Sequence, residues 1–264
     1  MEATPWRAAV RVARTVGHSR WDQVISLTAD SARIDFDTRV DWRERHRLLK
    51  AEFPTGIHAE EALNEIQFGF VRRPTHRSRP YDADRFEVCN HRYTALCDEA
   101  RGAAVLNDCK YGVSMLDDTI ALTLLRAPVS PDLHADQGLH AFRYSYTFWD
   151  GPWLASDAVR QAYAFNIPLT VAEGEAETTS LMRVDCPHVI IETVKLAEDG
   201  SGDMILRLYE CKHAACRAAL SLGFPARQAW LCDMLETPQT PLEITDGGIA
   251  LTFRGFEIKT LRLR

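Results

Sequence analysis

The most varied side-chain chemistry in the sequence lies in the segment LNDCKYG, residues 106–112. Asn107, Asp108 and Lys110 together offer hydrogen-bond acceptors and donors, and Tyr111 adds a flat aromatic face. Sugars are bound by hydrogen bonds to their hydroxyl groups and by aromatic rings packed against their C–H faces. These four residues therefore form a candidate sugar-binding loop, with an ordinary polar turn after a strand as the alternative.

A second set of candidate groups is the row of aspartates Asp35, Asp37 and Asp41. On a β-strand, side chains two residues apart share a face and lie about 7 Å apart, a spacing that resembles the paired carboxylates of glycosidases. However, Arg33 and Arg39 alternate with these aspartates along the same face. The pattern favours a charge-balanced, solvated strand face over a catalytic pair.

No complete catalytic or metal-binding motif occurs in the sequence. It contains no His-Glu-x-x-His, Gly-x-Ser-x-Gly, Gly-x-Gly-x-x-Gly or phosphate loop. His134 and His140 lie six residues apart without further ligands nearby, and the seven cysteines include no Cys-x-x-Cys pair. An odd number of scattered cysteines is typical of thiols in a reducing compartment. We therefore expect no metal ion and no cofactor in this chain.

The elements that must position these groups are mainly strands. Apolar and polar residues alternate with a period of two, which is typical of strands with one wet face. A short helix is predicted over Asp157–Phe165, with Ser156 as its N-cap and Pro168 beyond its end. Many short strands separated by polar turns predict an all-β protein. The alternating stretches are residues 33–42, 66–70, 120–124, 140–149, 204–208 and 249–253.

Two domains are expected from a change in pattern near residue 170. Residues 170–180 are small, polar and acidic and have no periodicity, which is typical of a linker. Longer strands precede this segment and shorter strands follow it. We predict a β-domain over 1–170, a linker over 171–184 and a small immunoglobulin-like β-sandwich over 185–264.

Composition restricts the class of function. The chain has 264 residues, of which 46% are hydrophobic, and 31 basic against 37 acidic residues give it a net charge of −6. An acidic balance argues against coating DNA or RNA, because that binding depends on Lys and Arg neutralising phosphates. No apolar run approaches the length of a membrane span, and no signal peptide is visible. A soluble, cytoplasmic protein with no nucleic-acid or membrane partner is predicted.

The ordered motifs along the chain resemble the C-terminal β region of family 38 glycoside hydrolases, the class II α-mannosidases. The resemblance covers nearly the whole sequence. The motifs that carry it are RIDFDT (33–38), DWRERH (41–46), EIQFG (65–69), RPTH (73–76), FEVC (86–89), LNDCKYG (106–112), ADQG (135–138), VIIETVK (189–195), RLYE (207–210) and FEIKT (256–260).

This resemblance implies a large antiparallel supersandwich of the galactose-mutarotase type, followed by the small β-sandwich. It also implies that a separate N-terminal β/α domain carries the zinc ion and the carboxylate nucleophile that cleave α-mannosides with retention. That domain has no counterpart in this sequence. We therefore expect this chain to be inactive alone, with an α-mannoside and the catalytic domain of the same enzyme as its partners.

The same resemblance gives the candidate loop a role. In related mannosidases the matching loop reaches the active site, where a basic residue contacts the substrate. Lys110 is the candidate for that contact here, with Asn107 and Asp108 as hydrogen-bond partners and Tyr111 beside them. Some relatives carry an Arg-Arg pair where this chain has Cys109-Lys110.

Two other functions remain open from the sequence. The chain could be an independent carbohydrate-binding module, since supersandwich folds bind sugars on a concave face. It could also be an assembly domain that contacts the catalytic half or a second copy of itself in a homo-oligomer. A substrate-completing and stabilising portion of an α-mannosidase is the function that the motifs favour.

Overall fold

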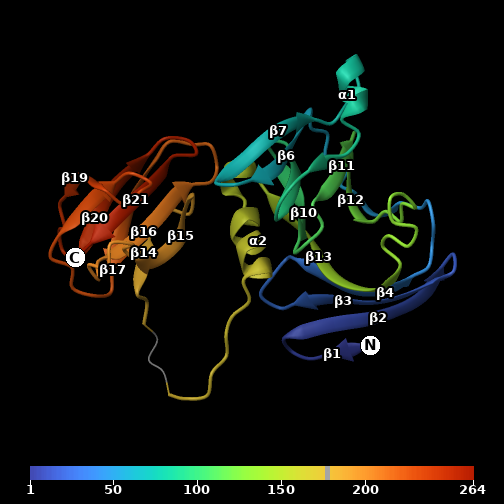
Figure 1. Ribbon diagram of the computed structural model, residues 1–264, viewed down its shortest axis with the longest axis horizontal. Coiled ribbons are helices and arrows are strands. Elements are labelled where there is room, and N and C mark those ends of the chain that lie inside the picture. Colours follow the sequence, from blue (N-terminus) through green and yellow to red (C-terminus); the bar gives the residue numbers. More distant parts are fainter. Residues whose placement is uncertain (176–178) are drawn as a thin grey trace. The chain divides into compact units, whose positions relative to one another are not determined.

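The computed structural model describes residues 1–175 and 179–264, and Figure 1 gives the order of its elements. The chain divides into two compact units, Met1–Thr170 and Val171–Arg264, called here the first and second units. Residues 176–178 of the predicted linker lie outside the described residues. Met182–Val184, at the end of that predicted linker, form strand β14.

The larger sheet of the first unit is antiparallel throughout and contains nine strands within the described residues. Consecutive strands pair at its N-terminal side, whereas β13 inserts between β4 and β10. In spatial order the strands are β1 (Glu2–Ala3), β2 (Arg7–Val16), β3 (Ser19–Thr28), β4 (Ile34–Trp42), β13 (Gly138–Asp150), β10 (Arg101–Asn107), β9 (Tyr93–Cys97), β6 (Glu61–Ile66) and β7 (Gly69–Pro74).

The alternation in β4 explains which face of this sheet is buried. Thr38, Val40 and Trp42 are buried, whereas Asp37 and Arg39, which alternate with them along the strand, are exposed, as expected for a strand with one apolar face. The β4–β13 register places Phe36 opposite Tyr144, and their rings stack with centroids 5.0 Å apart. The aspartate row 35–41 therefore lies on the face directed away from this core.

A second antiparallel sheet packs on that apolar face. Its strands, in spatial order, are β5 (Leu49–Pro54), β12 (Thr119–Leu125), β11 (Gly112–Leu116) and β8 (Val88–Cys89). Ile120 and Leu122 of β12 join Trp42 and Val105 of the larger sheet in one cluster of buried side chains. Burying apolar surface between two sheets is the main term that stabilises such a sandwich.

Helices are few among the described residues. Helix α2 (Ala158–Asn166) contacts β10 and β9 of the larger sheet, and Figure 1 shows it against that sheet. It confirms the predicted helix, but Asp157 rather than Ser156 occupies the N-cap position. A short helix α1 (Pro80–Asp84) and a 3-10 turn η1 (Trp153–Ala155) complete the set.

One predicted strand is wrong. The alternation over residues 66–70 predicts a single strand, but β6 ends at Ile66 and β7 begins at Gly69. Phe68 lies in the turn between them with φ +59°. Three apolar residues at alternate positions mimic a strand because the turn itself carries an aromatic side chain.

The second unit is a small β-sandwich whose inner faces enclose their own apolar cluster. Leu206, Leu208, Leu220 and Leu261 are almost completely buried there. One sheet has the order β14 (Met182–Val184), β17 (Cys216–Leu222) and β20 (Gly248–Phe253). The other has the order β15 (Val189–Leu196), β16 (Met204–Glu210), β21 (Ile258–Leu263), β18 (Ala229–Cys232) and β19 (Pro238–Leu242).

The predicted all-β class, a large antiparallel supersandwich followed in the chain by a small β-sandwich, is confirmed. Across the described parts of the chain, no helix is long and apolar enough to cross a membrane. The seven cysteines all lie within residues 1–175 and 179–264, and each is a free thiol.

Candidate functional site

Asn107 anchors the candidate loop from below. It is the last residue of β10 and is almost completely buried. Its side-chain Nδ2 donates to Asn90 Oδ1 at 3.0 Å and to the His91 carbonyl at 2.7 Å, and its Oδ1 accepts from Lys110 N at 2.8 Å. Asn107 therefore fixes the backbone of the loop and does not line the open pocket described below.

Asn90 is a second anchor that sequence reasoning missed. This buried residue donates from its backbone N–H and from Nδ2 to the Tyr111 carbonyl, at 2.8 and 3.1 Å. The two buried asparagines thus hold Lys110 and Tyr111 at both ends of one turn. Nothing local in the sequence marks Asn90, because its partners lie 17 and 21 residues away along the chain.

Asp108 is engaged away from the pocket. Its carboxylate forms an ion pair with Arg143, with Oδ2 and Nε 3.2 Å apart, and also accepts from Arg143 N at 3.2 Å. Arg143 donates in turn to the Phe165 carbonyl of α2 at 3.2 Å. The predicted role of Asp108 as a substrate partner is therefore not visible in this arrangement, where it ties the loop to β13.

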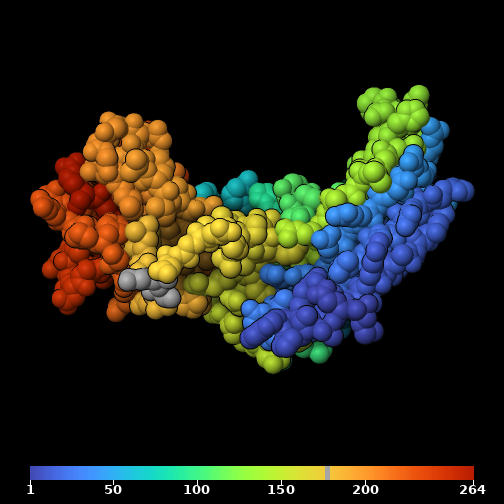
Figure 2. Space-filling model, turned by 90° about the horizontal axis from the view of Figure 1, so that it is seen from below, coloured from blue at the N-terminus to red at the C-terminus, as the bar shows by residue number. Residues whose placement is uncertain are grey.

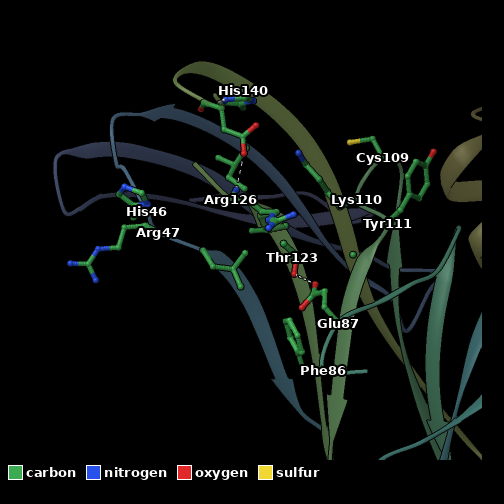
Figure 3. A pocket seen from close by; sticks show the side chains of 15 residues that line it. His46, Arg47, Phe86, Glu87, Cys109, Lys110, Tyr111, Thr123, Arg126 and His140 are labelled. Carbon is green, nitrogen blue, oxygen red and sulfur yellow. Dashed lines mark hydrogen bonds between the residues drawn. The ribbon is translucent and has the colours of Figure 1, made fainter. Parts of the chain in front are cut away.

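Lys110 and Tyr111 both line an open pocket of about 740 Å³ in the first unit; in Figure 3 the Lys110 side chain extends into it, whereas the Tyr111 ring lies at its margin. The Lys110 ammonium lies 4.7 Å from the centroid of the Phe142 ring, and Tyr111 is 56% exposed. The pocket is lined by His46, Arg47, Leu48, Phe86, Glu87, Cys109, Lys110, Tyr111, Gly112, Thr123, Leu124, Leu125, Arg126, Asp136 and His140.

Glu87 lies on one wall of this pocket, and each of its carboxylate oxygens has a hydrogen-bond partner. Lys50 Nζ lies 2.7 Å from its Oε2 and also donates to Ser114 at 2.7 Å, while the Thr123 hydroxyl donates to Oε1. A Cβ at Gly112 would approach Glu87 Oε1 to 3.0 Å. Glycine therefore lets the loop pass close to a carboxylate whose charge Lys50 balances.

Asp136 occupies the opposite rim. Its Oδ2 accepts from the backbone N–H groups of Arg126 and Ala127, at 2.8 and 3.0 Å. Burial would raise the pKa of this carboxyl, but the two N–H groups more than offset that effect and lower the pKa. Its carbonyl also lies 2.8 Å from His140 Nε2. Asp136 therefore fixes the connection that carries Arg126 and His140.

Two connections build the outer part of the pocket. His46 N donates to the Ala127 carbonyl at 2.9 Å, and Arg45 donates to the Leu133 carbonyl at 3.4 Å. These bonds join the β4–β5 connection to the β12–β13 connection. Figure 2 shows the light-blue and light-green residues of these segments rising together at one end of the first unit.

Cys109 is not an activated nucleophile. Burial, a hydrogen bond to Asp108 and the charge of that carboxylate raise the pKa of its thiol to about 11. The thiolate is the reactive form of cysteine. At neutral pH this side chain is therefore an uncharged thiol on the pocket wall.

The described residues do not offer a zinc site. Within residues 1–175 and 179–264, no group of three or more His, Cys, Asp or Glu side chains is placed to hold a metal ion. His140 is engaged with the Asp136 carbonyl, and His134 does not line the pocket.

Glu87, Asp136 and Arg126 are charged pocket residues that were not among the site residues predicted from the sequence. Glu87 stands in the motif FEVC and Asp136 in the motif ADQG, so both belong to the stretches that carry the family resemblance. Arg126 has no such signal. Its place in the pocket follows only from the end of β12 and the hydrogen bond to Asp136.

Comparisons with known proteins agree on one family. The model of the glycosyl hydrolases family 38 C-terminal domain matches residues 1–134, and that of the family 38 C-terminal beta sandwich domain matches residues 188–261. Alpha-mannosidase 2C1 of Homo sapiens is 38% identical over 254 residues, which cover 93% of this chain. Alpha-mannosidase G of Dictyostelium discoideum is 35% identical and also covers 93% of it.

A solved structure shares the fold. The alpha-mannosidase from Enterococcus faecalis V583 covers 93% of this chain with a TM-score of 0.79 at 22% identity, while the match covers 29% of that protein. The chain spans 24% of the length of the human and Dictyostelium relatives. The matched ranges, the order of the motifs and the two β-sandwich units lead to one conclusion: the chain belongs to the C-terminal region of glycosyl hydrolase family 38.

Proposed function

We propose that this chain is the non-catalytic C-terminal portion of a retaining α-mannosidase, where it completes the substrate site and stabilises the enzyme. The observation that carries the proposal is the position of Lys110. Two buried asparagines, Asn90 and Asn107, hold its loop, and its ammonium faces an open pocket beside an exposed tyrosine. The relatives whose names state an activity are alpha-mannosidases.

In this proposal Lys110 orients a mannoside and performs no bond cleavage. An ammonium donates up to three hydrogen bonds to sugar hydroxyl groups, and Tyr111 offers a flat face for the C–H surface of the ring. The nucleophile, the general acid and the zinc ion would be supplied by the catalytic region of the enzyme. Rigid positioning of a donor lowers the entropic cost of holding the sugar in its reactive orientation.

The test is a chimera in which this chain replaces the matching region of Alpha-mannosidase 2C1. We expect turnover of an aryl α-mannoside, and a Lys110→Met variant whose kcat/KM is lower by roughly 10- to 100-fold. Lys110→Arg should recover part of the loss because it keeps the charge. Arg77→Met, which removes a charge from an exposed site outside the pocket, is the matched control.

Two results would contradict this role. One is a Lys110→Met chimera with the kcat/KM of the unsubstituted chimera. The other is hydrolysis of the aryl α-mannoside by the chain alone, with or without added zinc, that disappears when Lys110 is replaced. The first would remove Lys110 from the substrate site, and the second would place the chemistry on this chain.

A second candidate is an independent carbohydrate-binding module in the cytoplasm. The exposed rings of Tyr111 and Phe86, which are 56% and 63% accessible, favour it because stacking rings recur in sugar sites. Calorimetric titration of the chain with mannose and manno-oligosaccharides is the measurement. The absence of a binding signal at millimolar sugar would rule out the independent binding module and leave the role as part of a larger enzyme.

A further inference from the structure

The pocket holds cations that form no ion pair with its own acidic residues, although the charge of Lys110 helps to lower the pKa of Asp136. Among residues 1–175 and 179–264, no carboxylate lies within the 4.0 Å ion-pair distance of Lys110 or Arg126. Figure 3 shows both side chains directed toward the middle of the pocket, whereas Arg47 points away from it. Two cationic groups from separate elements, the β10–β11 loop and the end of β12, therefore face one space.

The two carboxylates of the lining are already engaged. Glu87 is paired with Lys50 and accepts from Thr123, and Asp136 accepts from the N–H groups of Arg126 and Ala127. Neither is free to move to Lys110 or Arg126 without losing these bonds. Backbone N–H groups leave the charge of Asp136 in place, but Lys50 balances Glu87, so Lys110 and Arg126 together exceed the one remaining carboxylate and can bind an external anion.

This local charge is opposite in sign to that of the chain, which carries a net charge of −6. A cleft of one sign within a surface of the other concentrates oppositely charged ligands. Two aromatic side chains, Tyr111 and Phe86, flank the same pocket and are mostly exposed. The combination of cations and open rings suits a ligand with both an anionic group and an apolar ring face.

We infer that the pocket binds a sugar that carries an anionic group, either a phosphate or a carboxylate. The inference rests on the proposed function and narrows it to an anionic α-mannoside. The Arg126 guanidinium provides a planar fork for two oxygens of such a group, Lys110 adds a point charge, and Phe86 and Tyr111 border the space for the sugar ring. A neutral mannoside would offer these cations hydrogen bonds but no opposite charge.

The experiment is a set of titrations of the purified chain followed by calorimetry and by NMR. The probes are mannose, mannose 6-phosphate, mannuronate and inorganic phosphate. We expect mannose 6-phosphate or mannuronate to bind at least about 10-fold more tightly than mannose. Whichever of mannose 6-phosphate and mannuronate binds more tightly identifies the anionic group as a phosphate or a carboxylate. The affinity should fall as the salt concentration is raised, because added ions screen the cations.

Substitutions locate the site. Lys110→Met and Arg126→Met should each weaken binding of the charged sugar by at least about 5-fold, whereas Arg77→Met should leave it unchanged. The NMR spectra of all three variants serve as the check that each remains folded. Charged-sugar binding that survives both pocket substitutions would overturn the inference.

Three further outcomes would also overturn it. They are equal affinity for mannose and the charged sugars, equal affinity for inorganic phosphate and mannose 6-phosphate, and no binding of either charged sugar at millimolar concentration. The proposed function is judged separately, by turnover of a neutral aryl α-mannoside in the chimera. A chimera that depends on Lys110 while the titrations fail would keep the proposed function and remove only the anionic substrate.

Discussion

The pocket of the first unit and the ion network of the second unit use charged side chains in opposite ways. In the second unit, Arg262 Nε lies 2.6 Å from Asp203 Oδ2 and Arg262 Nη2 lies 2.7 Å from Asp199 Oδ2. Arg264 adds a third pair with Asp203 at 2.8 Å. In the pocket, Lys110 and Arg126 have no such partner among the described residues.

This difference separates charges that hold the fold from charges available to a ligand. The network joins the turn between β15 and β16 to the C-terminal strand β21, so its bonds are satisfied within the unit. The pocket instead uses its buried hydrogen bonds to fix the backbone of one loop and leaves the cation of that loop exposed to ligands. Removing a residue should therefore affect stability in the network, and binding in the pocket.

The asparagine below the pocket should produce the largest effect on stability. Asn107→Ala removes three hydrogen bonds of a buried side chain and leaves the His91 carbonyl and Asn90 without that partner. We expect a loss of about 3 kcal/mol in the free energy of unfolding. Urea unfolding gives the value, and hydrogen exchange localises it to the first unit.

Asn166→Ala is the control for this change. Asn166 is only partly buried and donates to two backbone carbonyls, so its loss should be about 1 kcal/mol. If the two substitutions lowered the free energy of unfolding equally, the buried bonds of Asn107 would contribute no more than those of Asn166. If Asn107→Ala destabilised the second unit as much as the first, the assignment of its effect to the first unit would be wrong.

The buried arginine of the network should come next. Arg262→Met leaves Asp203, whose side chain is 4% exposed, with Arg264 as its remaining partner. We expect the second unit to lose about 2 kcal/mol, less than for a pair left with no counter-charge. Slower or unchanged hydrogen exchange in β21 would contradict this expectation. Arg264→Met, at a side chain 56% exposed, should cost less.

Acid should weaken the second unit through the same network. The hydrogen bond from Arg264, opposed by burial and assisted by Arg262, lowers the pKa of Asp203 to about 2. Ser201 and Arg262 hold the pKa of Asp199 well below its usual range. Because both folded pKa values lie below the unfolded value near ~3.9, this stabilisation is present above that pH and is lost as the pH falls through about 2.

The measurement is thermal unfolding of the second unit between pH 5 and pH 2, followed by hydrogen exchange in β21. The loss should be smaller than that from Arg262→Met, since solvent screens the outer members of the network. An Asp203→Asn variant should show a flatter dependence on pH. If the stability of the Asp203→Asn variant fell as steeply with pH as that of the unsubstituted chain, other carboxyl groups would be the cause of the acid destabilisation.

The smallest effect on stability is expected at Lys110. Lys110→Met removes no ion pair among the described residues, and it keeps a flexible apolar stem over the Phe142 ring. The free energy of unfolding should change by less than about 1 kcal/mol, because only the contact of the ammonium with the Phe142 ring is lost, although binding falls. A large loss of stability here would mean that the ammonium is part of the fold, and the contrast between the two regions would disappear.

The sequence was sufficient to predict elements whose pattern is local. The strands around Ile34–Trp42 and Met204–Glu210 alternate because one face is buried, and that alternation can be counted without a structure. The strand β2 (Arg7–Val16) was not predicted because most of its side chains are exposed on both faces. A strand without a buried face has no hydrophobic period to detect.

The pocket was less predictable than the fold. The loop carrying Lys110 and Tyr111 was identified from its mixture of side chains, but the partners that fix it were not. Asn90 and Arg126 reach the loop only when distant strands pair, and no local pattern specifies such an approach. The expected hydrogen-bonding role of Asp108 was drawn from the same mixture, whereas its position depends on Arg143 of β13.

The pocket is assembled from five stretches of chain, near residues 46, 86, 110, 125 and 138. No one of them can form it alone, so the pocket exists only after both sheets of the first unit have come together. A small molecule bound there would contact both sheets of the first unit and, because it binds only the folded state, would raise the melting temperature of that unit. Ligand binding to the pocket therefore also reports whether the first unit has folded.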